Sequence, residues 1–453
     1  MTPARLAAAR TLVAVERGRT TLGAEVERAR GDVATARDRG LFLELVAGTL
    51  RWRNALDACL SACSRRPIAD LDADVRATLR LGAYQLLQLD RVPDHAAVHE
   101  AVDATKALGH ERAAGFVNAV LRALARRGAA ALPPRPAGGR PRAAALAYLS
   151  VTLSHPDWIV ARWLDRHGFE STEAWCRFNN DVTDVAVRPI AGASPADLLA
   201  RLRVAGVDAE PGAFVGDAVR LRAGALGRLD ADTRASLLVQ DEASQLVAHA
   251  VGARPGERIL DLCAAPGGKT SVLSGDMSGV GLLVASDHRP SRVALLRATL
   301  ARARVPARVL ALDAASALPF GPVFDRVLVD APCSGIGTLR RDPDLKWSRA
   351  PADLPALASR EAAILDQAAG AVRPGGLLVY VTCSSEPEEN EVVVDRFLAS
   401  RREFEPGAFE WGATIRDPGR LVDRRGFVRT LPFRDRLDAF FAAALRRRPS
   451  PGL

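Results

Sequence analysis

The sequence predicts a multidomain protein: an all-helical N-terminal region, a small α+β module, and a C-terminal α/β domain built on a parallel sheet. Three observations support this. Apolar residues recur at helical spacing up to residue 127, a Pro/Gly-rich stretch follows at 128–142, and strands alternate with helices from residue 235 onward. With 453 residues the chain is too long for one ordinary core, so several domains are expected.

The composition is that of a globular protein with a basic bias. The formal charge is +9, and the excess of basic residues is concentrated before residue 140. This favours a polyanionic partner such as RNA. No apolar run approaches the ~18 residues of a membrane helix, and the N-terminus has no apolar signal core. Six cysteines spread over a long chain suit a reducing compartment, so a cytoplasmic protein without membrane segments is expected.

Residues 1–127 are predicted to form a helical bundle with a basic surface. The helical spacing is clear in stretches such as Val75, Leu79 and Leu86, and Pro93 and Gly109 mark turns.

Two groups in this region could suggest metal chemistry. His95, His99 and Glu100 follow the order His-x-x-x-His-Glu, which differs from the His-Glu-x-x-His of zinc proteases. Cys59 and Cys63 lie one helical turn apart without further ligands nearby, as packing residues do. No metal site is expected.

A second module follows the linker at 128–142, whose sequence is GAAALPPRPAGGRPR. Residues 143–234 begin with a helical pattern and continue with short strands at Val185–Arg188 and Val219–Leu221. We expect a small α+β module here, and a catalytic domain at 235–449.

The catalytic domain contains a small-residue turn typical of a cofactor site. A predicted strand, Arg258–Leu262, runs directly into the turn, which opens a helix. The turn has neither the Gly-x-x-x-x-Gly-Lys spacing of phosphate loops nor Gly-x-Gly-x-x-Gly, so S-adenosylmethionine fits better than a nucleoside triphosphate or NAD. The candidate cofactor-binding residues are Cys263, Ala264, Ala265, Pro266, Gly267, Gly268 and Lys269.

Carboxylates end the following strands. Asp287 follows the apolar run Leu282–Ser286, Asp313 follows the next run and Asp330 the one after. A carboxylate at the end of the second strand can accept hydrogen bonds from ribose hydroxyls, and Asp313 is placed to accept from an adenine amino group. The series favours a bound ligand over isolated helix caps.

Two cysteines follow successive strands of the same predicted sheet. Cys333 lies in Asp330–Gly335, and Cys383 follows Leu377–Thr382. A thiol beside a methyl donor suits methylation at carbon 5 of a pyrimidine, because thiolate addition at carbon 6 makes carbon 5 nucleophilic. An acid near ring N3 would stabilise the adduct. Cys333 stands out at first as the nucleophile, because Asp330 lies beside it.

The N-terminal region resembles the NusB-like RNA-binding domain. The stretches that carry this resemblance are Arg80–Leu87, Val98–Val102 and Gly115–Arg122. In bacteria this domain is fused to ribosomal RNA cytosine methyltransferases.

The catalytic domain resembles the RNA (cytosine-5) methyltransferases, which have a Rossmann-like fold. Its motifs are ILDLCAAPGGKT, DAPCSGIGTLRRDPDLKW and VYVTCSSEPEENE. The resemblance implies that Cys383 is the nucleophile, that Cys333 assists release of the product, and that Asp330 binds and polarises the cytosine. It also implies that the turn residues and the three aspartates bind S-adenosylmethionine. Departures from the family pattern are Val381, Ala439 and the segment Val187-Arg188-Pro189.

The combined resemblance is to bacterial 16S rRNA (cytosine-5) methyltransferases, whose usual target is cytosine 967. It implies 16S rRNA, within a small-subunit assembly intermediate or free, as the partner. Alternatives are a tRNA cytosine-5 methyltransferase, a non-catalytic RNA-binding assembly factor and a small-molecule methyltransferase. The sequence has only three lysines, Lys106, Lys269 and Lys346. The candidate RNA-contacting residues are Arg340, Arg341, Lys346, Arg51, Arg53 and Arg122.

Overall fold

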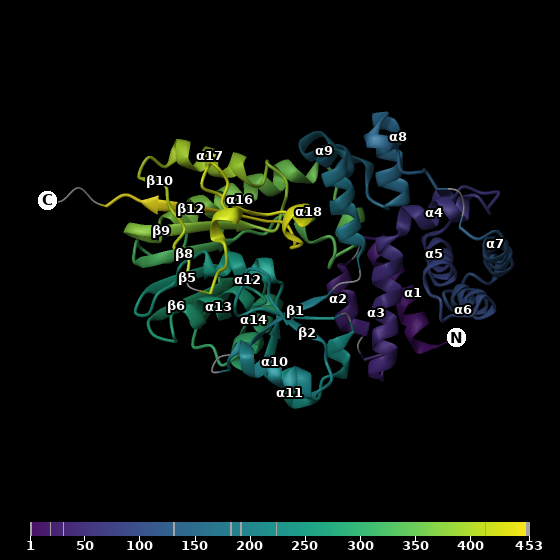
Figure 1. The fold of residues 1–453 in the computed structure, drawn as a ribbon, viewed down its shortest axis with the longest axis horizontal. Coiled ribbons are helices and arrows are strands. Elements are labelled where there is room, and N and C mark those ends of the chain that lie inside the picture. Colours follow the sequence, from purple (N-terminus) through teal and green to yellow (C-terminus); the bar gives the residue numbers. More distant parts are fainter. Residues whose placement is uncertain are drawn as a thin grey trace. The chain divides into compact units, whose positions relative to one another are not determined.

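The computed structural model describes residues 2–18, 20–29, 31–129, 132–181, 184–190, 193–222, 224–412 and 414–449. Its contacts divide the chain into two units (Figure 1). The first unit comprises Met1–Asp181 together with Leu339–Arg349, and the second comprises Val182–Thr338 together with Ala350–Leu453. The short segment 339–349 therefore lies between two parts of the second unit in sequence but packs with the first.

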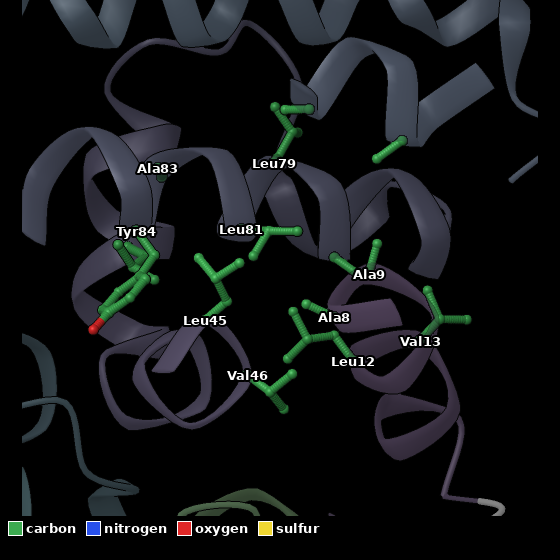
Figure 2. Close-up of a cluster of buried hydrophobic side chains, with 14 of the residues drawn as sticks. Ala8, Ala9, Leu12, Val13, Leu45, Val46, Leu79, Leu81, Ala83 and Tyr84 are labelled. Atoms are coloured by element: carbon green, nitrogen blue, oxygen red, sulfur yellow. The ribbon is translucent and has the colours of Figure 1, made fainter. Parts of the chain in front are cut away.

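The first unit is helical, as the apolar periodicity predicts. Figure 2 shows side chains of α1, α3 and α5 meeting in its core, with Leu45 and Leu79 fully buried. Asp72 begins α5 by accepting a hydrogen bond from the backbone of Asp74, and Thr35 caps α3 in the same way. The main helices are α1 (Pro3–Glu16), α2 (Leu22–Ala29), α3 (Ala36–Arg51), α4 (Arg53–Ser61), α5 (Ala73–Gln88), α6 (Asp94–Ala107), α7 (Ala114–Arg127), α8 (Arg142–Ala147), α9 (Asp157–Asn180) and α15 (Leu345–Ser348).

The placement of α8 and α9 differs from the expected domain division. We expected residues 143–234 to form one module, but the helical part up to Asp181 packs with the N-terminal helices. The backbone N–H of Asn54 donates to Ser154 Oγ at 3.0 Å, and the Asn54 amide donates to the Ser150 carbonyl at 3.2 Å. Within α9 the indoles of Trp163 and Trp175 stack with ring centroids 4.2 Å apart. Sequence pattern identifies such helices but not the core that they join.

The β part of the predicted middle module is a small antiparallel sheet in the second unit. Its strand order is β2-β3-β1-β4, and Val187, Leu198 and Val219 contribute to a core of its own. The elements are β1 (Val185–Pro189), α10 (Pro195–Val204), β2 (Ala209–Pro211), β3 (Val219–Leu221), α11 (Ala231–Ala235) and β4 (Leu237–Val239).

The C-terminal part of the second unit is a mixed sheet in the order β10-β12-β9-β8-β5-β6-β7, with β11 paired to β12. The strands β9, β8, β5, β6 and β7 are parallel, whereas β12 runs antiparallel to β9. The strands are β5 (Arg258–Leu262), β6 (Leu282–Asp287), β7 (Arg308–Ala311), β8 (Phe324–Asp330), β9 (Val372–Thr382), β10 (Phe404–Pro406), β11 (Val428–Thr430) and β12 (Phe440–Arg447).

Helices cover both faces of this sheet, as its continuous apolar strands predict (Figure 1). Successive residues of β9 alternate between the faces: Leu378 packs in the cluster with α16 and α17, and Leu377 in the cluster with α12 and α13. The helices of this part are α12 (Glu242–His249), α13 (Gly268–Asp276), α14 (Pro290–Arg302), α16 (Asp353–Ala369), α17 (Glu391–Ser400) and α18 (Pro432–Asp435). The arrangement confirms the predicted α/β fold and brings the carboxyl ends of the parallel strands to one edge.

None of the helices in the described ranges is long and apolar enough to span a bilayer.

Candidate active site

The small-residue turn lies between β5 and α13, as predicted. Cys263 has φ of +59° and Gly267 has φ of +107°, so the backbone doubles back sharply before the helix begins. A Cβ on Gly267 would lie 2.9 Å from the Leu296 side chain, and one on Gly268 would lie 3.1 Å from the carboxamide of Gln240. The Leu296 and Gln240 side chains occupy the space that a Cβ would need, so the turn packs closely against them at these two positions.

Beneath the turn lies a buried carboxyl group, Asp261, at the end of β5. Thr270 Oγ1 donates to its Oδ2 at 2.6 Å, while the buried Oδ1 has no protein partner. Burial raises the pKa of Asp261 to about 7. The turn therefore has a polar floor with one unsatisfied oxygen, and this fits a ligand with hydrogen-bond donors.

Asp287 ends β6, and its side chain is hydrogen-bonded to the turn between β5 and α13. Its carboxylate accepts the backbone N–H of Ala265 at 3.2 Å and pairs with Arg292 at 3.1 Å. Arg292 also donates to the Ala265 carbonyl at 2.6 Å. Arg292 was not among the predicted site residues, although its place in the first turn of the helix after Asp287 puts a cation beside that acid. Asp313, after β7, is half-buried and accepts the N–H of Ala315 at 3.1 Å.

Lys269 connects the cofactor turn to the end of β8. Its Nζ lies 2.7 Å from Oδ2 of Asp330, and both side chains are largely buried. The ammonium also lies over the ring of Phe440, 5.3 Å from its centroid. The residues of the predicted cofactor site and of the predicted cytosine site therefore meet in one ion pair.

The two predicted cysteines lie together. Cys333 follows β8 and Cys383 follows β9, which are adjacent parallel strands, and the two Sγ atoms are 3.3 Å apart. The hydrogen bond to Cys383, and then burial, raise the pKa of the Cys333 thiol well above its ordinary value. Cys333 is therefore protonated near neutral pH, and the two sulfur atoms lie within hydrogen-bond distance of each other.

A buried carboxylate that the sequence analysis did not single out lies behind the cysteines. Glu389 is fully buried and binds Ser334 and Ser384, the residues that follow Cys333 and Cys383. In the sequence, Glu389 stands in the acidic run that follows Cys383. Such a run ordinarily predicts a solvent-exposed surface.

The candidate RNA-contacting residues fall into two groups. Arg341 and Arg122 are exposed. Lys346, in contrast, is fully buried inside the first unit, where its Nζ donates to the Arg51 carbonyl at 3.2 Å, the Ser154 carbonyl at 3.1 Å and Asn180 Oδ1 at 2.9 Å.

Arg51 is also buried, and its guanidinium donates to the Arg340 carbonyl at 3.2 Å. Arg340 lies over the ring of Phe178, and Arg53 over that of Trp347. The structure thus gives Lys346 and Arg51 a packing role in place of the solvent-facing one that direct RNA contact needs. Compact burial with three acceptors explains why position 346 needs a lysine.

Among the described residues, one cluster has the composition of a metal site: Asp72, Asp74 and His110, on the first unit. Asp74 is already paired with Arg17 at 2.8 Å. His95 and His99 are exposed and do not belong to this cluster.

Three family models match successive parts of the chain. One described as the NusB family matches residues 2–126, one described as an RsmF/B-like ferredoxin-like domain matches 155–225, and one described as 16S rRNA methyltransferase RsmB/F matches 248–446. The expected kinds of domain, namely a NusB-like domain, a small middle domain and a methyltransferase domain, are thereby confirmed.

Relatives similar to this chain carry the same description over nearly their whole length. The probable ribosomal RNA small subunit methyltransferase B of Bacillus subtilis is 35% identical over 417 residues, covering 91% of each chain. The ribosomal RNA small subunit methyltransferase B of Pseudomonas putida is 37% identical over 410 residues, covering 90% of each chain. A crystal structure of the protein PH0851 has a TM-score of 0.79 at 24% identity and covers 99% of both chains, which supports the fold.

Proposed function

Since the chain belongs to the RsmB/F family of 16S rRNA methyltransferases, we propose that it methylates carbon 5 of a cytosine in 16S rRNA through a covalent adduct with Cys383. Its substrate is RNA, and its cofactor is S-adenosylmethionine, which supplies an electrophilic methyl group. The proposed target is cytosine 967, and the proposed setting is a small-subunit assembly intermediate in the cytoplasm.

The observation that carries the proposal is the 3.3 Å separation of the Cys333 and Cys383 sulfur atoms, at the ends of adjacent strands. The thiolate of Cys383 adds to carbon 6 of the cytosine, which leaves carbon 5 electron-rich and able to take the methyl group. Removal of the proton from carbon 5 then lets the Cys383 sulfur leave, and this restores the aromatic ring and the thiolate.

Cys333 suits the second half of the reaction, in which the proton on carbon 5 is removed and the Cys383 sulfur leaves. While both thiols are free, the hydrogen bond to Cys383 is the largest cause of the raised pKa of Cys333. Once the Cys383 sulfur is bonded to carbon 6, that cause is gone, and Cys333 can release its own proton to water. The resulting Cys333 thiolate then accepts the carbon-5 proton, directly or through a water molecule.

Asp330 would bind the cytosine at N3 and its amino group, where charge develops in the adduct. The proposed cofactor residues are Cys263 to Lys269, Asp287, Asp313 and Asp330. The unpaired oxygen of Asp261 and the acids at the strand ends support this assignment.

The test compares two serine variants with 16S rRNA and S-adenosylmethionine. Cys383→Ser should lose covalent RNA capture, whereas Cys333→Ser should accumulate a protein–RNA adduct that survives denaturing electrophoresis. Cys63→Ser, in the helical unit, controls for loss of a thiol and should behave as the parent protein. Capture by Cys383→Ser would contradict the assigned roles.

The target is tested separately, by bisulfite sequencing of total RNA from a deletion strain with and without the restored gene. Loss of the mark at cytosine 967 is expected. Loss at another rRNA position, or at a tRNA position, would replace the proposed target.

A further inference from the structure

The loops that carry Cys333 and Cys383 are both hydrogen-bonded to one buried side chain, Glu389, which we call the anchor. Each catalytic cysteine is followed directly by a serine, Ser334 after Cys333 and Ser384 after Cys383. The carboxylate of Glu389 accepts the Ser334 backbone N–H at 2.6 Å and the Ser334 hydroxyl at 2.6 Å, and the Ser384 hydroxyl donates to the same Oε2 atom. All three side chains are buried, with exposed fractions of 0–1%.

The anchor is itself fixed from several sides. The hydroxyl of Tyr380, on β9, donates to the Glu389 backbone carbonyl at 2.6 Å. The next residue, Asn390, accepts from the Thr382 hydroxyl at 2.5 Å and donates to the Ser384 carbonyl at 3.0 Å. The position of Glu389 is therefore tied to the loop that carries Cys383. Because Glu389 also binds Ser334, the position of the Cys333 loop is fixed relative to the Cys383 loop.

We propose that Glu389 is a positioning residue, which holds the two catalytic thiols at the separation needed for Cys333 to act on the adduct formed by Cys383. This rests on the proposed two-cysteine mechanism. The thiols belong to loops separated by a long stretch of chain, and charge-assisted hydrogen bonds to one carboxylate are the strong, directional contacts able to fix their relative position. A glutamine has one acceptor oxygen and would turn N–H donors toward one of the hydroxyls.

The neighbouring carboxyl group supports the arrangement. Glu361 lies beside Glu389, and its Oε2 is 3.2 Å from the Tyr380 hydroxyl oxygen. Burial, and then the charge of Glu389, raise the pKa of Glu361 to about 9. Near neutral pH Glu361 is therefore protonated, so it does not repel the carboxyl group of Glu389 that receives the three hydrogen bonds.

The first test measures thiol geometry without RNA. Diamide oxidises two adjacent thiols to a disulfide and is itself reduced to the hydrazine, so the rate of Cys333–Cys383 disulfide formation reports how well the sulfurs meet. Glu389→Gln should slow this rate about tenfold or more, since small displacements are costly for reactions between positioned groups. Ser334→Ala and Ser384→Ala should each give part of the effect.

A matched control removes a comparable carboxylate elsewhere. Glu242 is buried to a similar extent and accepts the backbone N–H groups of Phe214 and Val215 at 2.6 and 3.1 Å. Glu242→Gln should lower the melting temperature by an amount similar to Glu389→Gln but leave the disulfide rate unchanged. If both variants slow the reaction equally, the effect is general destabilisation and the proposal is overturned.

The second test measures turnover. Glu389→Gln should lower kcat about 10- to 100-fold with little change in KM for RNA, and should accumulate the denaturation-resistant adduct as Cys333→Ser does. If Glu389→Gln does not fold, Ser384→Ala provides the same readouts. If Glu389→Gln and Ser384→Ala form the disulfide and turn over at normal rates, the positioning role of Glu389 is overturned, whereas the proposed function is not. Absence of an adduct in Cys333→Ser overturns the proposed function instead, and the disulfide assay still reports on Glu389.

Discussion

The ammonium of Lys269 lies 2.7 Å from the carboxylate of Asp330, and this ion pair joins the proposed cofactor turn to the strand end that precedes Cys333. Lys269 lies in the first turn of α13, the helix that follows β5, and Asp330 ends β8, the strand adjacent to β5 in the sheet. Neither charge is well solvated, so each depends on the other for compensation. The pair therefore couples the position of the turn to the position of the proposed cytosine-binding acid.

Lys269→Met should lower methyl transfer by about 10- to 100-fold, because Asp330 loses its partner and turns toward water, away from the position required for catalysis. The measurement is transfer of labelled methyl groups to 16S rRNA, together with calorimetric binding of S-adenosylhomocysteine. Lys269→Arg keeps the charge and should recover part of the loss. Lys106→Met, an exposed lysine of the helical unit, is the control. Unchanged transfer in Lys269→Met would contradict the coupling.

Asp261 gives the protein a specific pH dependence. Its pKa is about 7 in the folded chain, because of burial, and ~3.9 in an unfolded chain. Between these values the folded state holds the extra proton, so this group's contribution to stability is greatest at low pH and is lost as the pH rises through about 7.

Asp261→Asn removes this titration. The stability of the variant relative to the parent protein should therefore rise by up to about 3 kcal/mol between pH 5 and pH 7 and stay level above pH 8. Urea unfolding of the cofactor-free protein at several pH values measures the difference. Asp232→Asn, at an exposed carboxyl group on α11, controls for the loss of a carboxyl group as such. A constant difference for Asp261→Asn would show that the carboxyl is not protonated in the fold.

Lys346 is expected to stabilise the helical unit. Lys346→Met leaves three buried oxygens without a donor, at a cost of roughly 1–3 kcal/mol each, partly offset by relief of the buried charge, so we expect a net loss of about 2 kcal/mol. Hydrogen exchange should increase in peptides covering Leu339–Arg349 and the end of α3. Lys106→Met again serves as the control, and equal exchange in the two variants would contradict this role.

The pH dependence of Lys346 has the opposite sign to that of Asp261. Burial lowers the pKa of Lys346 well below its ordinary value, so the unfolded chain binds more protons than the folded chain over the range between the two values. The stability of the parent protein relative to Lys346→Met should therefore rise as the pH increases from the folded toward the unfolded pKa.

Much of the catalytic domain could be predicted because its signals are local. The runs Val327–Val329 and Leu377–Val381 are apolar enough to be buried strands, and they lie inside β8 and β9. Parallel strands end at one edge, so residues such as Asp287, Asp330, Cys333 and Cys383 could be expected together from their position after strands alone. The resemblance then separated the roles of the two cysteines, which periodicity could not.

What sequence pattern missed depends on distant partners. Glu389 lies in an acidic run that is typical of a solvated surface, and its hydrogen bond with Ser334, far away in the chain, is not visible in the sequence. Lys346 lies in a basic, proline-broken segment, yet its acceptors are supplied by Arg51, Ser154 and Asn180. Such tertiary contacts leave no periodic trace, so residue type and neighbours alone suggested RNA contact for Lys346.

The packing of Leu339–Arg349 in the first unit affects when that unit can finish folding during synthesis, and whether the chain can be cut into separate units. The chain passes from one unit to the other after Asp181, after Thr338 and after Arg349. A ribosome that has released only the first 181 residues has produced a helical unit that still lacks Lys346 and the Trp347 indole, which donates to the Leu50 carbonyl at 2.7 Å. Completion of the N-terminal unit must await synthesis of a late segment, and no single cut in the polypeptide yields two intact halves.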